Sequence, residues 1–236
     1  MKIKVLSRYT HCVDRNECYS FLNLASIGNL LESDGRYQNQ KFMVDGIALC
    51  LILSIMTGKR IRRYSFDFSS IANEVFSKAE IEGSRVFLMG GTEDEIKKFS
   101  EIITEKYKDL VLVGCSSGYV KKVQMDSIGS CICSEKVDLV VVSMGAGMQE
   151  EFLLSLRSKN FTGIAYTSGG FVRQTAAAEQ LEYYPKLIKL IGLRACYRMF
   201  KEPHTVRRYF FDYPRNIFKV GCLFAAGKLK LEIFYD

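Results

Sequence analysis

The chain has 236 residues, 48% of them hydrophobic and 25% charged, with a net charge of +7. This length and composition are typical of a soluble globular protein with one sizeable domain, or a domain with an appendage. They exclude a membrane-spanning chain, because the longest apolar run, Ile47 to Met56, is about half a membrane span, and the first residues lack the long apolar core of a signal peptide.

The first quarter of the chain predicts a short helix around residues 23–33, a polar loop, and then a brief apolar strand. Asp45-Gly46 follows that strand and precedes a strongly apolar stretch, Ile47 to Met56, which we expect to form a buried helix. The order of these elements places a carboxylate at the end of a strand.

Four strand-like runs follow, and each ends in glycine or small polar residues: Arg85 to Gly91, Leu110 to Gly118, Val137 to Gly147 and Thr162 to Gly170. Their hydrophobicity is continuous rather than alternating, which indicates strands that are covered on both faces in a parallel sheet. Helices are predicted between them, at Thr92 to Lys108, where Thr92 and Glu95 have capping-box spacing, and at Gln149 to Lys159. Alternating strands and helices predict a Rossmann-like α/β fold, a parallel sheet flanked by helices.

The last fifth of the chain carries all of the excess positive charge. Residues 186–236 hold 11 Lys/Arg and 4 Asp/Glu, a net +7, so the other 185 residues sum to zero. These basic residues alternate with aromatic ones, which suits an anionic membrane, a nucleic acid or a phosphorylated ligand; the alternative is a solvated helix whose aromatics pack on the core. We predict a catalytic domain at 1–190 and a helical, basic appendage at 191–236 that docks on membrane and covers the active site.

Glycines are concentrated at the predicted carboxyl ends of the strands, where open parallel sheets bind ligands. They leave room for a bulky ligand to approach the backbone, although any one of them alone is explained equally well by a tight turn. We expect a cleft lined by Gly90, Gly91, Gly118, Gly145, Gly147, Gly169 and Gly170. A dinucleotide-binding turn is disfavoured, because Glu150 stands where G-x-G-x-x-G requires its third glycine.

The chemical inventory is narrow. Eight scattered cysteines without C-x-x-C are expected to be reduced, mostly buried thiols of a cytosolic protein, and with only His11 and His204 we expect no zinc site. No D-x-D motif is present to hold a metal on a diphosphate. Three polar residues in apolar surroundings are candidates for catalysis: Asp45 as a general base, and Arg63 and Gln149 as groups that orient or stabilise a substrate. For each, a structural role as a turn, surface or helix-start residue is the alternative.

Three segments, 87–120, 140–157 and 192–209, together resemble the WecG/TagA/CpsF glycosyltransferases. The features in common are a Gly-Gly loop before a helix, a G-x-x-x-G-Tyr-type segment, a strand ending in Gly-x-x-x-Gln-Glu, and a Tyr-Arg…Glu-Pro…Arg pattern near the carboxyl terminus. The match runs from about residue 40 to 215 in the same order. It resembles a capsule or exopolysaccharide branch of the family.

The resemblance implies an inverting, metal-independent transfer of a hexose or hexosamine from a UDP-sugar to a polyprenyl-diphosphate-linked acceptor. It places the catalytic aspartate at Asp45, with Arg63 and Gln149 as further catalytic residues. The substrate-binding positions that it implies, with the glycines named above, are Asn23, Gly90, Gly91, Gly118, Tyr119, Gly145, Gly147, Arg198, Arg207 and Arg208. No metal site and no cofactor are expected.

We therefore expect a cytoplasmic enzyme that is peripheral on the inner face of the plasma membrane and makes a bacterial surface polysaccharide. Its partners would be the donor, the lipid-linked acceptor and anionic lipid; no nucleic acid is expected, since no reading motif accompanies the basic tail, and a homo-oligomer is left open. Two alternatives remain: an NAD(P)-dependent Rossmann oxidoreductase, and a non-catalytic membrane-associated adaptor of polysaccharide assembly.

Overall fold

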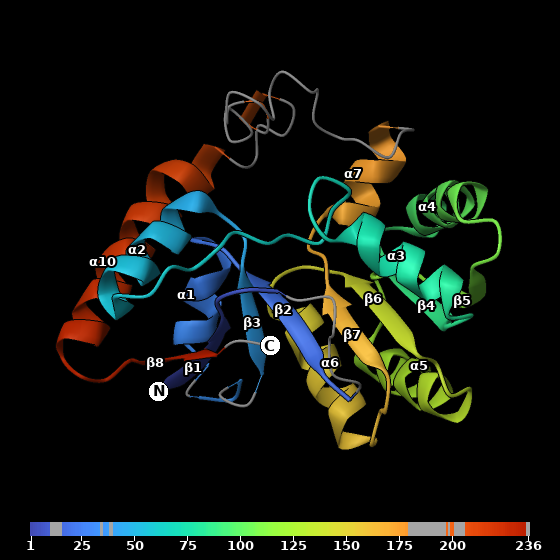
Figure 1. The fold of residues 1–236 in the computed structure, drawn as a ribbon, viewed down its shortest axis with the longest axis horizontal. Coiled ribbons are helices and arrows are strands. Elements are labelled where there is room, and N and C mark those ends of the chain that lie inside the picture. Colours follow the sequence, from blue (N-terminus) through green and yellow to red (C-terminus); the bar gives the residue numbers. More distant parts are fainter. Residues whose placement is uncertain are drawn as a thin grey trace.

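The structure is a computed structural model and describes residues 1–9, 16–33, 35–37, 40–178, 197, 199–200 and 206–234. In these residues one sheet of eight parallel strands runs in the order β5-β4-β6-β7-β2-β3-β1-β8 (Figure 1). The strands are β1 Lys2–Leu6, β2 Cys18–Leu22, β3 Lys41–Val44, β4 Arg85–Gly90, β5 Val111–Ser116, β6 Leu139–Ser143, β7 Ile164–Thr167 and β8 Lys230–Phe234. The parallel α/β fold predicted from the sequence is confirmed.

Helices cover both faces of the sheet. The helices are α1 Ser26–Leu31, α2 Ile47–Thr57, α3 Ala72–Ile81, α4 Glu93–Lys106, α5 Lys122–Ser134, α6 Met148–Ser158, α7 Phe171–Ala178, the π-helix η2 Arg208–Asp212 and α10 Tyr213–Ala225. One face of the sheet packs on α3, α4 and α7, and the other packs on α5 and α6 at one end and on α1, α2 and α10 at the other (Figure 1).

The local sequence explains the elements that were predicted. Strand β6 is buried along its whole length, as its unbroken run of branched residues indicates for a strand covered on both faces. Helix α4 begins with a capping box, in which Thr92 Oγ1 accepts from Glu95 N and Glu95 Oε2 accepts from Thr92 N. The predicted strand–helix alternation from residue 85 to 170 is therefore confirmed.

Two expectations about the fold need correction. Helix α2 is only half buried: Leu49 and Leu53 face the core, whereas Ile47, Leu51 and Ile55 are exposed. Apolar residues all round a helix predict burial, and here one side has no protein to pack on among the described residues. The thiols are also less buried than expected; the six described cysteines are free, but Cys115, Cys131 and Cys222 are exposed.

The carboxyl-terminal segment contributes a strand that the sequence did not predict. Strand β8 pairs with β1, from Lys2 beside Lys230 to Leu6 beside Phe234, and α10 packs Val220 into the cluster under α1 and α2. Within residues 213–234, β8 is therefore a strand of the sheet and α10 packs against the helices that cover it. The predicted boundary at residue 190 lies outside the described residues, as do most residues of the predicted helix at 186–203, so the division into domains stays a prediction. No helix in the described ranges is long and apolar enough to cross a bilayer.

Candidate active site

The carboxyl ends of the parallel strands form one edge of the sheet, which we call the rim. Helices α1, α2, α4, α5, α6 and α7 each begin shortly after a strand ends there. Their amino-terminal N–H groups therefore face the rim, which is the arrangement that favours anionic ligands. The connections diverge between the neighbouring strands β4 and β6, since β4 leads to β5 on one side and β6 leads to β7 on the other. Such a point is where open α/β sheets bind ligands.

Asp45 and Arg63 form an ion pair at the rim. Asp45 follows β3, and its backbone N donates to Leu22 O of β2 at 2.7 Å. The backbone of Arg63 forms an isolated parallel β-bridge with Val44, the residue before Asp45. Its Nη2 donates to Asp45 Oδ1 at 2.8 Å and to Ser65 Oγ at 2.9 Å. Both side chains are partly open to solvent, with exposed fractions of 30% for Asp45 and 25% for Arg63. A carboxylate held in one orientation yet reachable from solvent is suited to accept a proton from a bound hydroxyl.

Asn23 lies beside this pair. Its Oδ1 accepts from Ala25 N at 2.9 Å and from Ser26 N at 3.0 Å, which caps the start of α1. A Cβ on Gly46 would lie 3.8 Å from the Cβ of Asn23, so Asn23 and the Asp45-Gly46 turn are neighbours. Gly46 has φ +131°, a conformation that side chains rarely adopt. The structure thus gives Asn23 a capping role, and its predicted contact with substrate stays a prediction.

Gln149 is bonded within the protein at both ends of its amide. Its Oε1 accepts from Gly169 N at 3.3 Å, and its Nε2 donates to Glu150 Oε1 at 2.9 Å. The side chain is only 4% exposed. Gln149 therefore ties the start of α6 to the turn after β7, and its predicted reach toward a nucleotide-sugar is untested.

Glu150, the third residue of α6, is buried beneath the rim rather than exposed to solvent. It is 7% exposed. Its Oε1 accepts from Ser20 Oγ at 2.6 Å as well as from Gln149, and its Oε2 accepts from Gly147 N at 2.6 Å. Ser20 contacts Thr167 at 3.0 Å, so this polar cluster links α6, β2 and β7 beneath the rim.

Part of this bonding can be predicted from the position of Glu150 in the sequence. A glutamate at the third residue of a helix can accept a hydrogen bond from the backbone N–H of the residue before the helix, here Gly147. The hydrogen bond from Ser20 could not be predicted, because Ser20 belongs to the fully buried strand β2, which the sequence did not predict. Glu151, one residue later, faces outward and accepts from Arg36 Nη1 at 2.6 Å and from Tyr37 Oη at 2.8 Å. The Arg36 hydrogen bond lowers the pKa of Glu151, and burial raises the pKa of Tyr37.

The rim glycines divide into two kinds. A Cβ on Gly90 would lie 2.3 Å from Ser143 O, and one on Gly118 would lie 3.0 Å from the Cα of Gly90; close packing of the turns explains both. A Cβ on Gly145 or on Gly169 would meet nothing within 4 Å, so open space lies beside the backbone at both positions; Gly169 has φ +58°. Gly91 and Gly147 have φ of +62° and +95°, which favour glycine. Tyr119 is 76% exposed next to Gly118.

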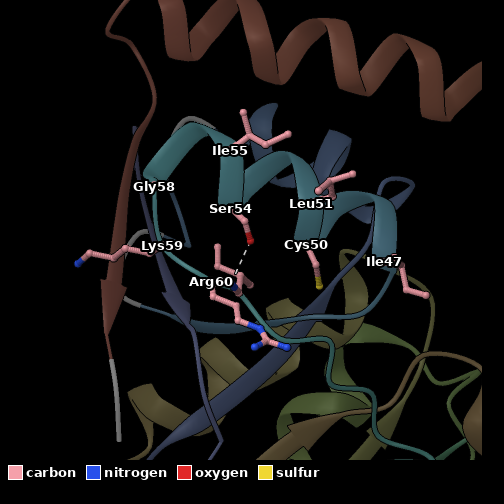
Figure 2. A pocket seen from close by; sticks show the side chains of 9 residues that line it. Ile47, Cys50, Leu51, Ser54, Ile55, Gly58, Lys59 and Arg60 are labelled. Carbon is pink, nitrogen blue, oxygen red and sulfur yellow. Dashed lines mark hydrogen bonds between the residues drawn. The ribbon is translucent and has the colours of Figure 1, made fainter.

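The order of the strands indicates how far apart Asp45 and the turn bonded by Gln149 lie. Gln149 bonds to the turn after β7, whereas Asp45 follows β3, and only β2 lies between these strands. At about 4.8 Å per strand, β7 and β3 lie about 10 Å from each other, so the turn that Gln149 bonds and Asp45 are two strand spacings apart on the same rim. A hollow of about 570 Å³ lies beside α2 and is lined by Ile47, Cys50, Leu51, Ser54, Ile55, Gly58, Lys59, Arg60 and Ile61 (Figure 2). It begins next to Asp45-Gly46 and does not extend to Gln149.

The tail is anchored at the rim. Asn216 of α10 donates from Nδ2 to Leu24 O at 2.7 Å, directly after Asn23, and Glu32 of α1 accepts from Lys219 Nζ at 2.9 Å. Arg207 and Arg208 are exposed. Arg208 precedes Asn216 by eight residues of continuous helix, which is about 12 Å at 1.5 Å per residue. Arg198 lies outside the described residues.

Thiols and acids give little for metal chemistry. Burial raises the pKa of the Cys18 thiol to about 12 and that of Cys50 to about 11, so neither is a thiolate near neutral pH. No group of three or more His, Cys, Asp and Glu that could hold a metal ion occurs in the described part of the chain. Metal independence stays a prediction.

Comparison with known proteins defines the class. A profile of the glycosyl transferase WecG/TagA/CpsF family matches residues 7–229. The chain belongs to this family and is a glycosyltransferase, and the resemblance inferred from its motifs is confirmed. A curated relative, the UDP-Gal:alpha-D-GlcNAc-diphosphoundecaprenol beta-1,4-galactosyltransferase of Shigella boydii, is 30% identical over 198 residues, which cover 84% of this chain and 83% of the relative. The family decides against the oxidoreductase alternative.

Proposed function

We propose that this chain is an inverting, metal-independent glycosyltransferase that moves a hexose or hexosamine from a UDP-sugar to a saccharide on a polyprenyl diphosphate, in bacterial surface polysaccharide synthesis. The name of the Shigella relative supports both substrates, since that enzyme uses UDP-galactose and a GlcNAc-diphosphoundecaprenol acceptor. The observation that carries the proposal is the Asp45–Arg63 pair, half open at a rim toward which six helix starts point.

The proposed reaction is a single displacement. Asp45 Oδ1 accepts the hydrogen bond of Arg63, and Oδ2 takes the proton of the acceptor hydroxyl. The hydroxyl oxygen then bonds to the anomeric carbon from the side opposite the leaving group, and the bond from that carbon to the β-phosphate oxygen breaks. UDP carries away the electron pair, and the anomeric configuration inverts. A positioned general base of this kind contributes about 10²- to 10⁴-fold to a rate.

The donor is proposed to lie along the rim, from the divergence between β4 and β6 toward β3. At that divergence Gly145 leaves open space and α6 presents its first N–H groups, which would face the diphosphate. Tyr119, exposed beside β5, is proposed to stack on the uracil ring. The sugar then points across β7 and β2 toward Asp45. Arg63, at the far end, is proposed to hold Asp45 in orientation.

The acceptor is proposed to approach from the side of the tail. Arg207 and Arg208 are exposed within about one strand length of the rim, and guanidinium groups bind diphosphate oxygens well. These arginines, with Arg198, would meet the acceptor diphosphate, while its polyprenyl chain stays in the bilayer. The enzyme would therefore work at the inner face of the plasma membrane.

The test is a panel of UDP-sugars incubated with a short-chain lipid diphosphate that carries GlcNAc, with products identified by mass spectrometry and their anomeric configuration by NMR. UDP-galactose is the first donor to try. We expect one added hexose or N-acetylhexosamine, a β linkage from the α-linked donor, and equal rates in EDTA and in Mg²⁺. Retention of configuration would contradict Asp45 as the base, and loss of activity in EDTA would contradict the metal-free account.

A further inference from the structure

We infer that the exposed side of α2, together with the basic turn that follows it, docks on the surface of an anionic lipid bilayer. We call this surface the α2 face and define it as Ile47, Leu51, Ile55, Lys59 and Arg60. Its residues lie outside the tail, to which membrane docking was assigned above, although α10 of the tail runs on the same side of α2 (Figure 2); the inference does not depend on the proposed reaction.

The apolar half of the α2 face is unusual for a protein surface. Ile47, Leu51 and Ile55 recur every four residues, so they lie along one side of the helix, and their exposed fractions are 70%, 61% and 74%. Scattered exposed aliphatic residues are ordinary, whereas a contiguous set marks a site of interaction. Figure 2 shows Leu51 and Ile55 pointing away from the sheet that α2 covers.

The charges around this stripe favour an anionic partner. The eleven residues of α2, IALCLILSIMT, contain no charged side chain. The turn that follows them contains Lys59, Arg60 and Arg62, all exposed. No acidic residue occurs from Gly46 to Tyr64. An apolar face bordered by basic residues without acids is complementary to anionic headgroups above an acyl layer.

The size of the helix decides how it meets the bilayer. Eleven residues extend about 16 Å at 1.5 Å per residue, which is about half of the hydrocarbon thickness. Helix α2 therefore lies in the plane of the interface, with its aliphatic side chains at the acyl boundary. The hollow of about 570 Å³ between the stripe and the Gly58–Ile61 turn gives space for a lipid headgroup beside Lys59 and Arg60 (Figure 2).

Docking on this face has a consequence for the site, and this consequence rests on the proposed function. Helix α2 begins two residues after Asp45. A bilayer in contact with Ile47 would hold Asp45 close to the membrane plane, where the diphosphate of a polyprenyl-linked acceptor lies. The α2 face would thus orient the rim toward its substrate.

The experiment measures flotation of the full chain with vesicles of phosphatidylglycerol and phosphatidylethanolamine. We expect the double variant Leu51→Gln/Ile55→Gln to lower the partition coefficient at least about tenfold, and Lys59→Gln/Arg60→Gln to lower it about fivefold per charge. High salt should reduce binding of the wild type more strongly than that of the second variant, which keeps only the charges of Arg62 and the tail. Vesicles of phosphatidylcholine should bind the wild type more weakly.

Matched controls change the same residue types elsewhere. Ile81→Gln/Val123→Gln removes two aliphatic side chains that are 84% and 78% exposed on α3 and α5, far from α2 in Figure 1. Lys97→Gln/Lys98→Gln removes two exposed positive charges from α4. Both controls should float like the wild type. Thermal unfolding and the transfer rate on a water-soluble acceptor should be unchanged in every variant.

Two outcomes would overturn the inference. One is that the α2 variants float as well as the wild type, which would leave the tail as the lipid contact. The other is that they change only the oligomeric state in analytical ultracentrifugation and not vesicle binding, which would make the face a contact between copies of the chain. Neither outcome bears on the transfer reaction, because the water-soluble acceptor assay reports that separately.

Discussion

The two ends of the sheet present different chemistry at one rim. At the end made of β5, β4, β6 and β7, the turns are rich in glycine and contain no acidic residue, and Glu150 beneath them is buried and bonded to three donors. At the end made of β2, β3 and β1, the rim carries the half-exposed pair of Asp45 and Arg63. Backbone donors at the first end suit a diphosphate, and the charged pair at the second suits proton transfer. Under the proposed function, donor binding and proton transfer would be divided between the two ends of the sheet.

The largest effect is expected from Asp45→Asn. The amide cannot accept the acceptor proton, so kcat should fall about 10³-fold while affinity for the UDP-sugar, measured by calorimetry, stays within about twofold. Asp67→Asn is the matched control, since Asp67 Oδ2 also lies near Arg63, at 4.0 Å, but is not proposed as a base. Turnover near the wild-type rate in the Asp45 variant would remove this residue from the mechanism.

Arg63→Ala should have the next largest effect. It removes the donor to Asp45 and Ser65, and we expect kcat to fall about 10²-fold. Arg62→Ala changes the adjacent, exposed arginine and should leave the rate on a water-soluble acceptor unchanged. Equal losses of kcat in the Arg63 and Arg62 variants would mean that the rate depends on positive charge in this region rather than on the contact between Arg63 and Asp45.

The glycine end can be tested with two alanines. Gly90→Ala places a Cβ 2.3 Å from Ser143 O and should lower the free energy of unfolding by about 3 kcal/mol, measured in urea. Gly145→Ala meets nothing within 4 Å, so stability should change by less than about 0.5 kcal/mol, while KM for the UDP-sugar rises. If Gly145→Ala leaves KM unchanged, the open space there is not the donor site.

Glu150→Gln should have a smaller effect, confined to stability. The substitution keeps the shape but weakens charge-assisted bonds from Ser20, Gln149 and Gly147, which we expect to cost about 2 kcal/mol in urea unfolding. Glu151→Gln, on the same helix, breaks a partly exposed ion pair with Arg36 and should cost under about 1 kcal/mol. Similar losses of unfolding free energy in the two variants would show that the buried cluster around Glu150 stabilises the fold no more than the exposed ion pair of Glu151 does.

Much of the fold could be predicted from the sequence, but only where local patterns were strong. Strands β4 to β7 and helix α4 carry unbroken apolar runs and a capping box, which depend on neighbouring residues alone. Strands β1, β2 and β8 were missed because their identity depends on distant partners. Ser20 interrupts the apolar run of β2 and bonds to Glu150, and β1 and β8, from opposite ends of the chain, pair with each other. The exposure of α2 was missed for the same reason, since periodicity cannot show whether a partner exists.

The candidate site was predicted in part. Both Asp45 and Arg63 were candidates from the sequence, and the structure brings them into contact on the rim where Gln149 also lies. The bonding of Gln149 into a buried cluster could not be predicted, because it requires the β2–β7 neighbour relation. The roles of Asn23, Tyr119 and the tail arginines remain predictions.

The account is tested most directly by a crystal structure of the Asp45→Asn variant with an intact UDP-sugar. We predict the diphosphate at the amino-terminal end of α6 near Gly145, and the anomeric carbon directed toward position 45 and Arg63. A donor bound elsewhere, or one whose sugar points away from position 45 toward β5, would contradict the division of labour between the two ends of the sheet.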